Sequence, residues 1–297
     1  MRDVPNRIHR AEVLTVTDLA PGLRRFVLGG AGLSDFETSG VGDEYLRIFL
    51  PDEPGGEPRM PIPVGAGGWD WPEGVAPSPL RTYTVRAWDA EQHRLSVDVV
   101  LHAGGLAAEW ARHASAGAVV AVNSPTGMYD PPADLEWQVL VTDLTGLPAA
   151  TRILQQTDPR VRSRLVVETP STAQRFAEEI PAAVDVQWVT GGNGVAPSRI
   201  EQLVRGLEWP AGVGYLWVVG ESRVLRAVRK HVRHELGRPA STYKIVAYWT
   251  ENAEEWNARW AALDAAVRQE LEDLWASERD EEEIEDEYFA RLTELGL

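Results

Sequence analysis

The chain has 297 residues, of which 44% are hydrophobic and 25% charged, a composition typical of a globular protein with more than one core. It contains no cysteine, which excludes disulfides, thiolate metal sites, iron–sulfur clusters and cysteine nucleophiles. The formal net charge of −16 argues against nucleic acid as a partner. The N-terminus lacks the apolar stretch of a signal peptide, and no segment is apolar enough to span a membrane. We therefore expect a cytoplasmic protein without membrane insertion.

Residues 1–133 are expected to form a first domain built of short strands. Alternating or β-branched runs occur at 11–16, 23–28, 45–50, 81–88, 94–101 and 119–122, separated by Gly, Pro and Asp turns. A long Pro- and Gly-rich connection covers 51–79. Many short strands with a single short helix predict a small antiparallel barrel.

Residues 134–250 have a different rhythm, in which apolar strands alternate with helices. Strands are predicted at 139–142, 164–168, 184–189, 215–219 and 243–249, and helices at 148–156, 172–179, 198–207 and 222–236. This alternation predicts a parallel sheet covered on both faces, with ligands at the carboxyl ends of its strands.

The negative charge is concentrated in residues 251–297, which hold 16 acidic and 4 basic side chains, a net charge of −12. Apolar residues at steps of three and four from Trp256 to Leu274 predict one face of a long helix, and Ile284, Tyr288 and Leu292 predict a second. We expect an acidic helical extension that packs its tryptophan face on the body. Docking of a partner on this extension is the alternative.

The segment Arg81–Arg86, with the sequence RTYTVR, contains the groups that a flavin site needs. An arginine for the diphosphate, an aromatic ring for the ribityl chain or ring system and a hydroxyl for the reactive nitrogen occur at Arg81, Tyr83 and Thr84. On a strand, Arg81, Tyr83 and Val85 share one face, and Thr84 and Arg86 share the other. An ordinary amphipathic strand with surface arginines is the alternative.

The segment LHAGGLAAEWA, residues 101–111, predicts an anion site. Gly104 and Gly105 allow a close turn, and a helix is expected to start at Leu106 or Ala107. Free amides at such a helix start bind a pyrophosphate. A plain strand–turn–helix is the alternative, and a lone histidine such as His102 is more often a core residue.

At this spacing, the two segments resemble the siderophore-interacting protein family, whose members are FAD-dependent, NAD(P)H-linked ferric-siderophore reductases of the ferredoxin-reductase-like superfamily. The resemblance covers nearly all of residues 7–250. It includes APGLRRFVLGG, PLRTYTVR, VDVVLHAGGLAAEWA, NSPTG, LTGLPAATRIL, RLVVET, GYLWVVGESRVLRAVRKHVRHELG and AYW. The expected architecture is an α/β two-domain protein, with an antiparallel flavin-binding β-barrel at 1–133, a parallel α/β NAD(P)H-binding domain at 134–250 and a helical acidic extension at 251–297.

The resemblance also implies cofactors and site residues. FAD would be the bound cofactor and NADPH or NADH the electron donor. Tyr83 and Thr84 would be catalytic, and Arg47 would contact the ferric siderophore. Cofactor contacts would come from Arg81, Tyr83, Thr84, Arg86, His102, Gly104, Gly105, Leu106, Ala107, Ala108, Asp143, Thr145, Glu168, Glu221 and Trp249. No protein metal ligand is needed, and we expect a monomer.

Several positions depart from the family pattern. The turn at 141–148 keeps only part of the family's Gly-Asp-Glu-Thr-Ala-Leu-Pro, and 105–110 lacks the serine of Gly-Pro-Ala-Ser-x-Trp. Thr250 replaces the arginine of Gly-Tyr-Trp-Arg, and Thr126 stands where an arginine is frequent. The missing basic residues favour an alternative, a flavin reductase that serves another acceptor or a redox partner protein. A non-catalytic member that binds flavin or chelate is the second alternative.

Overall fold

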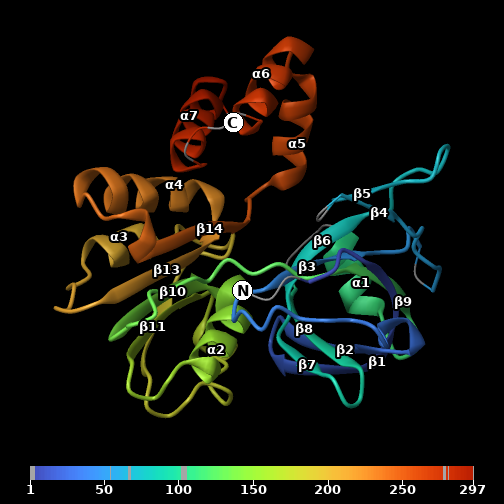
Figure 1. Cartoon of the computed structure of the whole chain (residues 1–297), viewed down its shortest axis with the longest axis horizontal. Helices are drawn as coiled ribbons and strands as arrows, with labels where there is room; N and C mark the ends of the chain where they lie inside the picture. The colour runs from blue at the N-terminus through green and yellow to red at the C-terminus, as the bar shows by residue number, and fades with distance from the viewer. Residues whose placement is uncertain are drawn as a thin grey trace.

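The computed structural model describes residues 4–53, 55–65, 68–101, 106–276, 279 and 281–296. Figure 1 shows a strand-rich N-terminal part beside a helix-covered sheet, with the last three helices stacked above that sheet. Within the described ranges, no helix combines the length and apolar character needed to cross a bilayer.

The N-terminal part is an antiparallel sheet of seven strands in the order β6-β3-β9-β1-β2-β8-β7. Its strands are β1 (Ile8–Ala20), β2 (Leu23–Gly29), β3 (Tyr45–Phe49), β6 (Leu80–Thr84), β7 (Ala87–Asp89), β8 (Arg94–Val100) and β9 (Val119–Asn123). The Arg86 amide donates to the Ser96 carbonyl at 2.9 Å, which brings the chain after β6 back to β8. The sheet therefore curls into the predicted barrel.

The barrel core is closed by helix α1 (Leu106–His113). Trp110 of this helix stacks on Phe26 with a centroid distance of 5.0 Å, and both side chains are buried. A 3-10 turn at Ala31–Leu33 follows β2. The segment 51–79, expected as a connection without strands, contains the hairpin β4 (Ile62–Val64) and β5 (Gly68–Asp70), which the sequence pattern did not predict.

The second part is the predicted parallel sheet, in the order β12-β11-β10-β13-β14. Its strands are β10 (Trp137–Asp143), β11 (Arg162–Thr169), β12 (Asp185–Thr190), β13 (Gly214–Glu221) and β14 (Tyr243–Trp249). Val139 and Val141 pack toward helices α3 (Ile200–Arg205) and α4 (Ser222–Lys230). Leu140 packs toward α2 (Leu147–Gln156). Alternate residues of β10 thus fill two cores, which explains its unbroken apolar sequence.

Four short helical turns complete this part. Leu144–Gly146 follows β10 and Ala240–Thr242 precedes β14, both as 3-10 turns. A π-helical turn, His231–Glu235, continues α4 and accounts for the predicted length of that helix. The helix expected at 172–179 is reduced to the 3-10 turn Thr172–Gln174, so that prediction was wrong beyond its first residues.

The C-terminal extension consists of α5 (Ala253–Ala262), α6 (Ala265–Trp275) and α7 (Glu281–Glu294). The predicted long helix divides at Asp264, whose Oδ1 accepts a hydrogen bond from the Ala266 amide at 2.8 Å and so caps α6. In the part of the chain that the structure describes, the tryptophan face is not packed on the core of the body as predicted. It packs within the extension, where Trp256 and Trp260 stack at 5.6 Å and Trp260 contacts Tyr288 of α7.

Helix α7 contacts the body instead, on α4 and on the π-helical turn that continues it. Asp286 lies 2.9 Å from Nε2 of His234 and 3.2 Å from Nη1 of Arg233. The Phe289 ring lies 5.0 Å from the Arg226 guanidinium. The acidic charge of the extension is therefore partly matched by basic side chains of α4 and of the π-helical turn after it, as expected for charges brought within a few ångströms.

Candidate functional site

The register of β6 against β3 sorts the flavin-like segment into two faces. Thr84 lies opposite Tyr45, Thr82 opposite Arg47, and Tyr83 opposite Leu46. Cross-strand partners point to the same side of a sheet. Leu46 is fully buried in the barrel core, and Tyr83 packs against that core. The face with Thr84, Tyr45 and Arg47 is therefore the one turned away from the barrel core.

The Thr84 face meets the second domain at Tyr248, near the end of β14. Thr84 is 6% exposed, and the Tyr248 ring lies edge-on to Trp217 at 6.2 Å. The Tyr248 hydroxyl is buried, and it interacts with the Thr84 side chain without forming a well-shaped hydrogen bond. No other described residue supplies a partner. A buried hydroxyl without a partner is costly, so this junction favours a ligand that supplies an acceptor.

Electrostatics keep the Tyr248 hydroxyl protonated. Burial raises the pKa of Tyr248 well above its ordinary value, and the nearby Asp43 carboxylate raises it further. The hydroxyl can therefore donate at any physiological pH. The reactive edge of a flavin offers nitrogen and oxygen acceptors, so the residues at this junction fit FAD.

Tyr83 and Thr84 come from the same segment but do not share a face. Burial raises the pKa of Tyr83 to about 12, and the neighbouring Arg81 partly opposes this shift. Arg81 itself is exposed, and its Nη1 donates to the Leu80 carbonyl at 2.8 Å. The catalytic assignment of Tyr83 stays a prediction, and so does the contact of Arg81 with the FAD phosphates.

Arg47 lies on the Thr84 face and is half-buried. Its guanidinium stands 5.1 Å from the centre of the Tyr45 ring, in a cation–π contact. Its backbone amide donates to Oδ1 of Asn123 at 2.6 Å. A positive charge is thus held on the same face as the candidate flavin contact.

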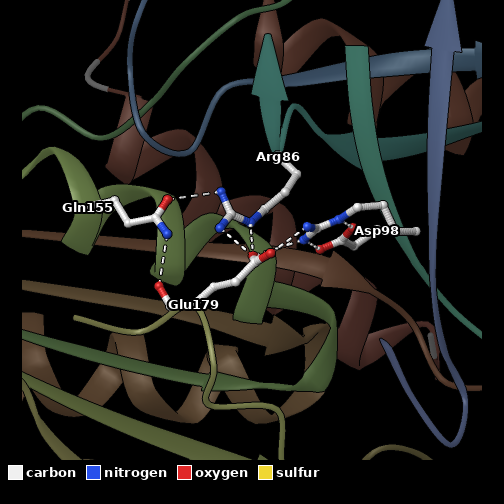
Figure 2. Close-up of polar contacts among 5 residues, drawn as sticks. Arg86, Asp98, Gln155 and Glu179 are labelled. Atoms are coloured by element: carbon white, nitrogen blue, oxygen red, sulfur yellow. Dashed lines mark hydrogen bonds and ion pairs between the residues drawn. The ribbon is translucent and has the colours of Figure 1, made fainter. Parts of the chain in front are cut away.

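Arg86 has a different environment from the one expected of a phosphate ligand. Figure 2 shows its side chain pointing at Glu179, with Asp98 to one side and Gln155 to the other. Its Nε and Nη2 donate to Oε2 of Glu179 at 3.1 and 2.5 Å, and Nη1 donates to Oε1 of Gln155 at 3.1 Å. Glu179 also accepts from Arg25 at 2.5 and 2.9 Å. The buried Arg86 therefore joins the two domains, and its contact with the cofactor stays a prediction.

The candidate pyrophosphate site lies only partly within the described residues. Helix α1 begins at Leu106, as the sequence predicts, and the side chains of Ala107 and Ala108 are buried. His102, Gly104 and Gly105 lie outside the described residues. The roles expected for these residues and for the amides of 106–108 stay predictions.

Asp143 stands at the carboxyl end of β10, where the sequence places the nicotinamide turn. Its Oδ1 accepts from the Thr145 amide at 2.9 Å and from the Thr145 hydroxyl at 2.6 Å. Its Oδ2 accepts from Nε1 of Trp249 at 2.6 Å. Burial raises the pKa of Asp143 to about 6, and the Glu168 carboxylate adds to the shift. Trp249 is thus tied to Asp143 at the edge of the sheet.

Glu168 is the next-to-last residue of the neighbouring strand β11, and its carboxylate is also bonded to internal partners. Its Oε2 accepts from the Ser198 hydroxyl at 2.8 Å, and Oε1 accepts from the Arg199 amide at 2.5 Å. Glu221 ends β13 and caps α4, accepting from the amides of Arg223 and Val224 at 2.8 and 3.1 Å. The predicted strand-end residues are therefore at the carboxyl edge, while their carboxylates bond to the chain itself.

A glycine-rich loop at 190–198 completes this edge, and the sequence analysis overlooked it. Asn193, with φ +57°, accepts from the Leu144 amide at 3.0 Å and donates to the Glu168 carbonyl at 3.1 Å, so it ties two strand ends together. Gly192 also has φ +57°, and a Cβ there would lie 1.9 Å from Oε2 of Glu168. The run Gly191-Gly192-Asn193-Gly194 after a predicted strand was the available signal.

Asp43 is a second residue that the sequence analysis missed. Its Oδ1 accepts from the amides of Met128 and Tyr129 at 2.8 Å each, and Oδ2 accepts from Nε1 of Trp217 at 3.2 Å. Burial raises the pKa of Asp43. This carboxyl connects the turn before β3, a strand of the Thr84 face, with the core of the second domain. Within the described ranges, no cluster of three or more His, Asp or Glu side chains is arranged to hold a metal ion.

An antiparallel barrel whose flavin-type strand faces the carboxyl edge of a parallel α/β domain defines an FAD-dependent oxidoreductase of the ferredoxin-reductase-like fold. The chain belongs to the siderophore-interacting protein family. The siderophore-interacting FAD-binding domain matches residues 12–129, and the siderophore-interacting protein model matches residues 135–252.

Three relatives illustrate this membership. An uncharacterized protein of Mycobacterium tuberculosis is 30% identical over 267 residues, covering 85% of this chain and 94% of the relative. The NADPH-dependent ferric-chelate reductase of Escherichia coli is 29% identical over 246 residues, covering 82% and 93%. The crystal structure of a siderophore utilization protein from T. fusca aligns with a TM-score of 0.74 at 25% identity, covering 84% and 95%.

Proposed function

We propose that the protein binds FAD against the Thr84 face of β6 and uses NADPH or NADH to reduce a ferric siderophore, with release of Fe(II). The observation that carries this proposal is the buried junction of Thr84 and Tyr248, where the Tyr248 hydroxyl lies beside Thr84 of β6 and forms no well-shaped hydrogen bond to any described residue. The name of the Escherichia coli relative, an NADPH-dependent ferric-chelate reductase, supports the choice of donor and substrate.

The chain contributes placement and charge to this reaction. Bound FAD would supply the hydride and single-electron chemistry of the reaction. Thr84 and Tyr248 hold donors at the flavin edge, and the carboxyl edge of the parallel sheet receives the nicotinamide. Arg47 offers a positive charge to an anionic chelate. Oxygen ligands hold Fe(III) much more strongly than Fe(II), so reduction loosens the chelate.

The proposal includes the domain boundaries of the chain. We propose an FAD-binding domain at 1–133, an NAD(P)H-binding domain at 134–250 and the extension at 251–297, acting as a cytoplasmic monomer. The gap between the end of β9 at Asn123 and the start of β10 at Trp137 supports the first boundary. The end of β14 at Trp249 supports the second.

The test follows flavin absorbance after anaerobic addition of NADPH or NADH, then Fe(II) formation with a ferrous-specific chelator after addition of a ferric siderophore. We expect bleaching with at least one nucleotide and chelate-dependent Fe(II). Thr84→Ala should slow flavin reduction about tenfold, since one lost hydrogen bond in the transition state is worth about 1.4 kcal/mol. Thr15→Ala, which removes an exposed threonine from β1, is the matched control.

A second candidate function, reduction of another acceptor, is favoured by Thr126. This exposed residue bridges to Tyr45 on the edge of the Thr84 face, with backbone hydrogen bonds of 2.9 and 3.0 Å. Family members frequently carry an arginine at this position, and Thr126 brings no charge to the chelate. Flavin reduction by nucleotide without chelate-dependent Fe(II) would establish this second function, and a protein that takes up no FAD would contradict both.

A further inference from the structure

Arg152 of α2 reaches across the domain junction to the strand that carries Thr84. Its Nη1 donates to the Val85 carbonyl at 2.7 Å, and its Nη2 donates to Oε1 of Glu44 at 2.5 Å. Arg152 is 7% exposed, and Val85 and Glu44 are fully buried. One planar guanidinium from the second domain therefore holds two groups of the first domain in a fixed relation.

The groups that Arg152 contacts are also hydrogen-bonded within the first domain. The Val85 amide donates to the Glu44 carbonyl at 2.9 Å, so both backbone groups of Val85 are bonded. The other oxygen of Glu44 accepts from the Ser39 amide and hydroxyl at 2.8 and 2.6 Å. Helix α2 also packs closely against the backbone two residues before Glu44, because a Cβ on Gly42 would lie 2.6 Å from Cγ1 of Ile153.

Glu179 makes a second cross-domain contact at the next residue of the segment. It binds Arg86 and Arg25, and Arg25 in turn pairs with Asp98 at 2.6 and 2.7 Å (Figure 2). The second domain therefore forms hydrogen bonds with two consecutive residues, Val85 and Arg86, immediately after Thr84. The direction of the Thr84 side chain is set by the backbone that these contacts fix.

We propose that Arg152 is a positioning residue for the flavin site, through which docking of the second domain sets the place of Thr84 at the FAD edge. The proposal deepens the function given above and rests on it for the identity of the reaction. It predicts that loss of this contact weakens FAD binding and slows flavin reduction, while nucleotide affinity stays unchanged. The reason is that the carboxyl edge of the parallel sheet does not contain Arg152.

The experiment compares four variants of the full-length holoprotein. Arg152→Met removes the contact, and Glu44→Gln/Arg152→Met also removes the carboxylate that would otherwise be buried without its cation. Arg152→Lys keeps the charge but loses the planar fork. Arg160→Met is the matched control, because this exposed arginine follows α2 and, among the described residues, pairs with its neighbour Asp158.

Four quantities are measured: the FAD dissociation constant by flavin fluorescence, the flavin reduction rate at saturating FAD, the dissociation constants of NADP+ and NAD+, and amide hydrogen exchange at Val85 and Arg86. We expect the double variant to bind FAD at least tenfold more weakly, to reduce it at least tenfold more slowly and to exchange both amides at least tenfold faster. Nucleotide constants should stay within twofold. Arg152→Lys should recover part of each loss, and the control should match the wild type.

Two results would overturn the proposal. A folded double variant with FAD affinity, reduction rate and amide exchange within twofold of wild type would show that Arg152 positions nothing. Equal losses in Arg152→Lys and Arg152→Met, with weakened nucleotide binding, would show a general structural role. If wild-type flavin is not reduced by either nucleotide, the proposed function fails, while FAD affinity and amide exchange still decide the role of Arg152.

Discussion

The buried carboxyl of Asp143 makes the stability of the protein depend on pH in a way that one substitution can isolate. Burial raises the pKa of Asp143 from 3.8 to about 6 in the folded state. The folded chain therefore holds the proton more tightly than the unfolded chain. The resulting stabilisation is complete below pH 3.8 and is lost as the pH rises through about 6. A shift of about two pKa units corresponds to about 3 kcal/mol.

Asp143→Asn removes this titration. The difference in unfolding free energy between variant and wild type should move by about 2.4 kcal/mol in favour of the variant between about pH 4 and pH 7. The substitution also lowers the free energy of unfolding by an amount that is the same at every pH. An asparagine that accepts from Thr145 turns its amide group toward the Trp249 indole N–H, and two facing donors cost about 1–3 kcal/mol.

Urea unfolding at a series of pH values from about 4 to 8 measures this difference. Asp158→Asn is the control, since hydrogen bonds from Arg160 lower the pKa of Asp158 to about 2. Its contribution is present above the unfolded pKa and is lost only as the pH falls toward about 2, so its difference from wild type should be flat over this range. A change of less than about 1 kcal/mol for Asp143→Asn would refute the reasoning.

Three further predictions concern other parts of the chain. Gly192→Ala should lower the free energy of unfolding by at least about 1–2 kcal/mol, because φ is +57° and a Cβ would lie 1.9 Å from Glu168; thermal unfolding checks this, and a neutral result would contradict it. Phe289→Ala should cost about 1–3 kcal/mol by removing the ring that contacts Arg226, with faster proteolytic release of the extension as the readout. Arg47→Gln should raise the KM for an anionic ferric chelate about tenfold, or about 1.4 kcal/mol, with FAD affinity unchanged; an unchanged KM would remove Arg47 from the substrate site.

Much of the fold follows from local periodicity. Most strands of both sheets were predictable because alternation, or an unbroken apolar run such as β10, indicates burial within one segment. The single strand predicted at 81–88 was wrong, since this run divides into β6 and β7 at opposite edges of the sheet. The break before α6 carried a visible signal in Asp264, but the apolar steps of three and four across it suggested a continuous helix. The packing partner of the tryptophan face was not predictable, since it depends on α7, many residues further along the chain.

The candidate site also has features that the local sequence predicts and features that it does not. Alternation along β6 correctly separates Thr84 from Tyr83, because the faces of a strand are a local property. The partners of Arg86 and Arg152 are 93 and 108 residues away, so no local pattern reveals that these arginines meet Glu179 and Glu44. From the sequence alone, an arginine next to a flavin-type motif can be interpreted as a contact to the cofactor phosphates or as a contact to the other domain. Only the tertiary structure distinguishes these two interpretations.

The acidic residues at the carboxyl edge can also be interpreted in two ways, as cofactor contacts or as acceptors for the backbone of the chain itself. The same physical cause applies to all of them. Asp143, Glu168 and Glu221 each lie at the carboxyl end of a parallel strand, and each accepts a hydrogen bond from a backbone amide beyond it. For Asp143 and Glu221 the donor belongs to the turn or helix directly after the strand, and for Glu168 it belongs to the segment just before α3. Because amides at the start of a helix or turn lack partners in the chain, a carboxylate there stabilises the fold without any ligand. A strand-end acid is thus evidence for cofactor contact only where those amides are satisfied in another way, and at these three positions they are satisfied by the acids themselves.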